Sequence, residues 1–204
     1  MAINKIFSVF EQKEFLLNSS PASILTGNEF SKKEGMTLTQ QVIEYYNSIG
    51  GKAISSVYGE IILDKQSVED DFAHGVGRKK AIAFAAVPNI IEKGIVILPL
   101  GHYKKGEKTI SAMIAAPLII GMDEYVCVII IRQYASGNKK LYVHEVFSKD
   151  KLLDSSSNPA LIPATNQGVM SESFVGSSNP ALIPATNQGD ITKVLQKIVS
   201  TKSK

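Results

Sequence analysis

The sequence has one cysteine, no tryptophan and no long uninterrupted apolar run among its 204 residues. A single cysteine, Cys127, excludes an internal disulfide, so nothing in the sequence points to an oxidising compartment. The longest apolar stretch, residues 112–122, contains Pro117 and Gly121 and is shorter than the roughly 20 residues that a membrane helix needs. The N-terminus lacks the apolar segment of a signal peptide. We therefore expect a cytoplasmic protein with no membrane partner.

An excess of one charge is also lacking. Lys and Arg number 22 and Asp and Glu number 19, which gives a net charge of +3. The excess lies on residues 190–204, which hold four Lys and one Asp. This balance excludes an extensive nucleic-acid-binding surface but leaves room for a focused site. Hydrophobic residues make up 44% of the chain, which is enough to bury a core and excludes a wholly disordered protein.

The pattern of apolar residues predicts an α+β fold, in which N-terminal helices precede a mainly antiparallel sheet of four to five strands. Cys127 falls in one of the apolar runs and is expected to be a core thiol. The expected helices cover residues 3–17, 37–48 and much of 67–92, with a break at Pro88. The expected strands cover residues 52–58, 60–63, 95–98, 111–120, 125–132 and 141–147, with turns at 121–124 and 137–140.

The C-terminal part contains an exact repeat. The 13-residue segment SSNPALIPATNQG occurs at residues 156–168 and again at 177–189. Each copy carries two prolines and little to bury, so an extended linker is one interpretation and a recognition segment is the other. The predicted organisation is an N-terminal helix (1–24), an α+β domain (25–148), a linker (149–189), and a C-terminal helix with a basic tail (190–204).

Common enzyme signatures are missing. We find no P-loop, no complete dinucleotide-binding glycine motif and no nucleophile elbow. One cysteine and three scattered histidines cannot supply a zinc site, so neither a metal nor a cofactor is expected. Arginine is used at only two positions, Arg78 and Arg132, where its planar fork suits phosphate or carboxylate.

His74 precedes two glycines and the basic cluster Arg78, Lys79 and Lys80, and His144 lies in an expected strand. Imidazole with Arg and Lys on a helix and a facing sheet meets the needs of metal-free RNA cleavage. The alternative gives these residues no catalytic role. In that interpretation each histidine hydrogen-bonds to groups close to it, and the basic cluster is a solvent-exposed surface.

Several segments together resemble the third class of large polyvalent protein-associated domain, found in proteins of phages and conjugative elements. The resemblance covers about residues 25–148. The motifs that carry it occur in order at residues 25–30 (LTGNEF), 59–63 (GEIIL), 74–81 (HGVGRKKA), 87–94 (VPNIIEKG), 115–117 (AAP) and 142–146 (YVHEV).

The order of helices and strands is also similar to that of the barnase/EndoU/colicin/RelE-like nucleases. That similarity implies that His74 and His144 act as general base and acid and that Arg132 assists them. It implies phosphate-binding roles for Arg78, Lys79 and Lys80.

Two functions from different classes follow. The first is a metal-independent ribonuclease-like effector of a mobile element, which acts on RNA in a bacterial host cell. The second is a non-catalytic accessory module that binds protein or nucleic acid, and its C-terminal helix is expected to contact another phage or element protein.

Overall fold

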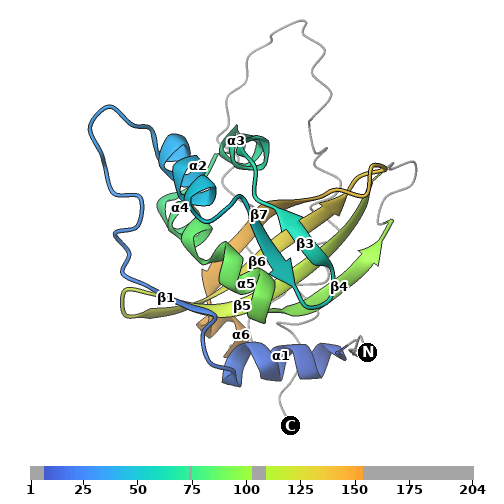
Figure 1. The fold of residues 1–204 in the computed structure, drawn as a ribbon. Coiled ribbons are helices and arrows are strands. Elements are labelled where there is room, and N and C mark those ends of the chain that lie inside the picture. The colour runs from blue at the N-terminus through green and yellow to red at the C-terminus, as the bar shows by residue number, and fades with distance from the viewer. Residues whose placement is uncertain (1–6, 74, 103–108, 154–204) are drawn as a thin grey trace, which may run out of the picture.

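The computed structural model describes residues 7–73, 75–102 and 109–153 (Figure 1). Its helices are α1 (Val9–Asn18), α2 (Leu38–Ser48), α3 (Lys65–Ala73), α4 (Arg78–Ala83), the 3₁₀ turn η1 (Phe84–Ala86), α5 (Val87–Lys93) and α6 (Asp150–Leu153). Its strands are β1 (Ser23–Leu25), β2 (Lys52–Ser55), β3 (Gly59–Ile62), β4 (Ile95–Gly101), β5 (Ile110–Ile120), β6 (Asp123–Gln133) and β7 (Lys139–Ser148).

The described strands form one curled, seven-stranded sheet in the order β1-β5-β6-β7-β3-β2, with β4 also paired to β5 (Figure 1). The pairs β1–β5 and β3–β7 are parallel, and the other pairs are antiparallel. The α+β class is therefore confirmed. Two finer expectations were wrong, because the helices are interspersed with the strands instead of all preceding them, and the sheet has seven strands instead of four to five.

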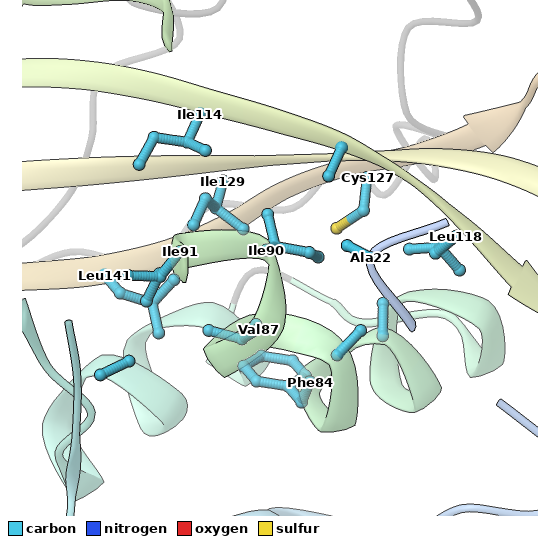
Figure 2. Close-up of a cluster of buried hydrophobic side chains, with 14 of the residues drawn as sticks. Ala22, Phe84, Val87, Ile90, Ile91, Ile114, Leu118, Cys127, Ile129 and Leu141 are labelled. Atoms are coloured by element: carbon cyan, nitrogen blue, oxygen red, sulfur yellow. The ribbon is translucent and has the colours of Figure 1, made fainter. Parts of the chain in front are cut away.

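The central strands β5 and β6 are buried on both faces. Helices α2 to α5 cover what we call the inner face, and α1 and α6 cover the outer face (Figure 1). Alternate residues of β6 point to opposite sides, so Ile129 and Ile131 belong to the inner core and Val128 and Ile130 to the outer core. Figure 2 shows the inner core, where α5 lies against β5 and β6. Near-continuous apolar runs in β5 and β6 follow from this two-sided burial.

Side-chain capping fixes where the first two helices begin. Ser8 and Glu11 form a reciprocal capping box at the start of α1, and Thr37 and Gln40 form another at the start of α2. These bonds satisfy backbone N–H groups that would otherwise have no partner in the first turn.

Pro117 marks the point where β5 changes its neighbour. β4 pairs with β5 as far as Ala115, and β1 pairs with it from Leu118 onward. Pro117 has no N–H to donate, and its carbonyl accepts from the Ala22 N–H at 2.8 Å. The sequence pattern predicted no strand before residue 52, because a three-residue parallel strand has too short a pattern to detect.

The region 67–92 is helical, as expected, but in several pieces. Gly75 and Gly77 separate α3 from α4, and Pro88 lies in the first turn of α5, where its missing N–H costs nothing. The break near Pro88 is therefore a fresh helix start.

The predicted domain boundaries stay predictions. β1 spans the expected boundary at residue 24, and α6 follows the one at 148. Residues 154–204, with the repeat, most of the expected linker and the C-terminal helix, lie outside the described residues. Within the described ranges, no helix is long and apolar enough to cross a membrane.

Candidate functional site

His144 lies at an irregularity in the strand pair β6–β7. Val128 pairs with Glu145 and Ile129 pairs with Val143, so His144 is the extra residue of a β-bulge. Such bulges occur often beside active sites, where they redirect a side chain. The backbone of β7 therefore departs from regular pairing at a predicted catalytic histidine. The His144 side chain lies outside the description.

The bulge also changes which residues share a face. In a regular strand, positions 143 and 145 would lie opposite residues of the same face. Here position 143 is opposite inner-face Ile129, and Glu145 is opposite outer-face Val128. One inserted residue shifts the pleat of every residue after it.

Arg132 lies on the outer face of β6. Ile130 faces the outer core and Ile131 the inner core, and the pairing stays regular through Arg132, which is opposite Lys140. His144 comes four residues after Lys140 along β7, or about 13 Å at the rise of a strand. Arg132 and His144 thus belong to the same strand pair, and Arg132 is half-buried there.

His74 itself lies outside the described residues. Its neighbours show where its segment runs, because α3 ends at Ala73 and α4 begins at Arg78. Both helices pack against β7. The α3–α4 connection therefore has its two ends at the strand that carries the bulge.

Arg78, predicted to bind phosphate, contacts the chain itself. Its guanidinium donates to the carbonyl oxygens of Phe30 at 3.0 Å, Glu29 at 2.8 Å and Gly27 at 3.3 Å. The side chain is exposed but its fork is occupied by the loop after β1.

The two lysines of the cluster also have internal contacts. Lys79 Nζ lies 4.8 Å above the Tyr125 ring, and a bond to the Tyr125 hydroxyl raises the Lys79 pKa. Lys80 Nζ is 3.4 Å from Asp71 Oδ1, a carboxylate of α3 that is only 5% exposed. The structure thus places the three cations on α4, over the inner face, whereas Arg132 lies on the outer face.

Two acidic residues near the bulge were not selected from the sequence. Burial raises the pKa of Glu145, against the opposing charges of Lys151 and Lys80. Asp71 is buried between α3 and α4. A perturbed carboxyl next to His144 is the kind of group that proton transfer uses. No sequence signal distinguished these residues. Glu145 has the pattern of a polar residue in a strand, and Asp71 has that of a solvent-exposed residue at the start of a helix.

The structure also describes Cys127, His102 and most of the acidic residues. Cys127 is fully buried, as expected, and burial raises its pKa to about 12. His102 is exposed at the end of β4, next to residues 103–108 that lie outside the description. Among the residues that the structure describes, no group of three or more His, Cys, Asp or Glu could hold a metal ion.

Comparison with known proteins adds no assignment. No protein-family model, no curated protein and no solved structure matches the chain.

Proposed function

We propose that this chain is a module of phage or conjugative-element polyvalent proteins that acts as a metal-independent ribonuclease in the bacterial host cytoplasm. The β-bulge at His144, on the strand against which both α3 and α4 pack, is the observation that carries the enzymatic part. The ordered motifs at residues 25–146 support the family.

The reaction assigns one proton transfer to each histidine. His74 takes the proton of a ribose 2′-hydroxyl, and the 2′-oxygen then attacks the adjacent phosphorus. The bond from phosphorus to the 5′-oxygen breaks, and His144 gives that oxygen a proton. Arg132 has no part in this step, because it lies on the outer face of the sheet while the helices that flank His74 cover the inner face. The products are a 2′,3′-cyclic phosphate and a 5′-hydroxyl end.

The test is cleavage of total bacterial RNA by the purified chain in EDTA. Wild type is expected to cleave, and His74→Ala and His144→Ala are each expected to lose at least about 100-fold in rate. Lys52→Ala is the matched control, since Lys52 is exposed on β2 and pairs with Glu60, far along the chain from the histidines. Intact RNA with a cooperatively folded wild type would overturn the proposal, and so would full activity of both histidine variants.

A second candidate function is a non-catalytic accessory module. The intramolecular contacts of Arg78, Lys79 and Lys80 favour it, because these groups would have to leave their partners to hold a phosphate. In this reading the chain leaves RNA intact. Retention of labelled RNA on a filter would then indicate a nucleic-acid partner, and no retention would indicate another phage or element protein, bound through residues 190–204.

A further inference from the structure

The loop between β1 and α2 presents three backbone carbonyls to one side chain. Nη1 of Arg78 donates to the Phe30 carbonyl, and Nη2 donates to those of Glu29 and Gly27. A planar guanidinium holds its donors in a fixed fork, whereas a lysine ammonium is a point charge on a flexible stem. The arrangement is therefore specific for arginine.

Internal contacts hold the loop in the conformation that accepts the Arg78 guanidinium. The Glu29 carboxylate accepts from the backbone N–H groups of Thr26 at 2.7 Å and Gly27 at 2.9 Å. Burial raises the Glu29 pKa, but these bonds outweigh burial and the net pKa is lowered. Phe30 adopts a positive φ of 53°, which is uncommon for a bulky residue and persists where contacts enforce it. Its ring packs edge-on against Tyr45 at 5.8 Å.

Arg78 is also the first residue of α4, directly after the segment 74–77. Two residues on, Lys80 pairs with Asp71 of α3, which lies before that segment. The start of α4 is thus tied to the loop by Arg78 and to the end of α3 by Lys80.

We propose that Arg78 is a positioning residue, whose fork joins the 26–30 loop to α4 and so fixes the connection that carries His74. The consequence for His74 rests on the proposed function, whereas the coupling between the two segments does not. Arg78 in this account contacts backbone, not RNA phosphate.

The test compares Arg78→Lys, which keeps the charge, with Arg78→Gln, which loses it. Amide hydrogen exchange is measured for residues 26–30 and 75–77, with Lys52→Ala as the control. Both Arg78 variants are expected to speed exchange in both segments to a similar extent, because both lose the fork. In the cleavage assay both are expected to lower kcat by about 10-fold or more, with KM changed by less than about 2-fold.

A phosphate-binding role gives the opposite pattern. Arg78→Lys would then keep wild-type exchange and much of its RNA affinity, while Arg78→Gln would raise KM, and this result would overturn the proposal. Unchanged exchange in both variants would overturn it as well. If wild type does not cleave RNA, the proposed function fails, and the exchange measurement alone decides the role of Arg78. Thermal melting verifies that each variant is folded.

Discussion

Gly94, directly after α5, lies where the helix and the sheet approach closely. A Cβ built on it would lie 2.5 Å from the Ile90 carbonyl oxygen and 2.6 Å from Ile114 Cγ2. Its φ of −72° is ordinary, so the requirement for glycine is one of space and not of backbone conformation. The glycine of the motif at 87–94 therefore has a packing role.

We expect Gly94→Ala to lower the free energy of unfolding by about 2 kcal/mol, because the added methyl must displace backbone. Gly77→Ala is the control, since a Cβ there meets nothing within 4 Å and φ is −68°. Urea denaturation measures both. A Gly94→Ala variant as stable as Gly77→Ala would contradict the close packing of α5 on β5.

Cys127 gives a prediction for alkaline pH. Burial raises its pKa from 9.0 to about 12, so the folded state keeps the thiol proton that the unfolded state loses above pH 9. The unfolded state then binds fewer protons, and the free energy of unfolding falls as pH rises from 9 toward 12. Stability measured at pH 8 and at pH 10 should fall less in Cys127→Ala than in wild type. Equal losses in the two proteins would contradict the buried, protonated thiol.

At the scale of elements, an ion pair between Asp71 and Lys80 links α3 to α4. The Asp71 side chain is 7% exposed and that of Lys80 is 22% exposed, so removing the carboxylate leaves a largely desolvated ammonium. We expect Asp71→Ala to cost about 2 kcal/mol in unfolding free energy.

Glu69→Ala is the matched control on the same helix. Its partner Lys65 and Glu69 itself are 68% and 50% exposed, so the loss should be below about 0.5 kcal/mol. Thermal or urea unfolding of the two variants compares them. Equal effects would mean that the Asp71–Lys80 contact does not stabilise the packing of α3 on α4.

The elements differ in how far the sequence predicts them. β5 and β6 are long apolar runs, and the region around α2 has a clear helical period, so sequence reasoning located them. β1 was missed because Ser23–Leu25 is ordered by a parallel neighbour far along the chain. The bulge at His144 was missed because it depends on the register with β6, which alternation within β7 alone does not contain.

The residues of the candidate site also differ in how far the sequence predicts their surroundings. Arg78 was predicted to bind phosphate, and its carbonyl partners lie 48 to 51 positions away, so they leave no local signal in the sequence. Arg132 and the cluster at 78–80 were expected to serve one site. Only the sheet places them over opposite faces.

At the scale of the whole molecule, burial on both sides makes α1 part of the core. Leu16 is 1% exposed and packs in the outer core with Met113 and Val126. We expect Leu16→Ala to cost about 3 kcal/mol, as buried leucines usually do. Leu153→Ala is the control, because Leu153 is 63% exposed. An effect below about 1 kcal/mol, seen by urea denaturation, would contradict the packing of α1 on the sheet.

The motifs behind the family resemblance also have structural roles across the molecule. Arg78 binds the motif at 25–30, and Gly94 packs against Ala115 of the motif at 115–117. These contacts explain why such residues would occur together in one fold. They leave the enzymatic proposal to depend on the bulge and the two histidines.

The most direct measurement is analysis of the ends of RNA incubated with wild type and His144→Gln in EDTA. The account predicts 2′,3′-cyclic phosphate and 5′-hydroxyl ends with wild type, and at least about 100-fold fewer with His144→Gln. RNA that stays intact with folded wild type would contradict the ribonuclease proposal. Cyclic phosphate formed equally by the His144→Gln variant would contradict the role of His144 as the proton donor.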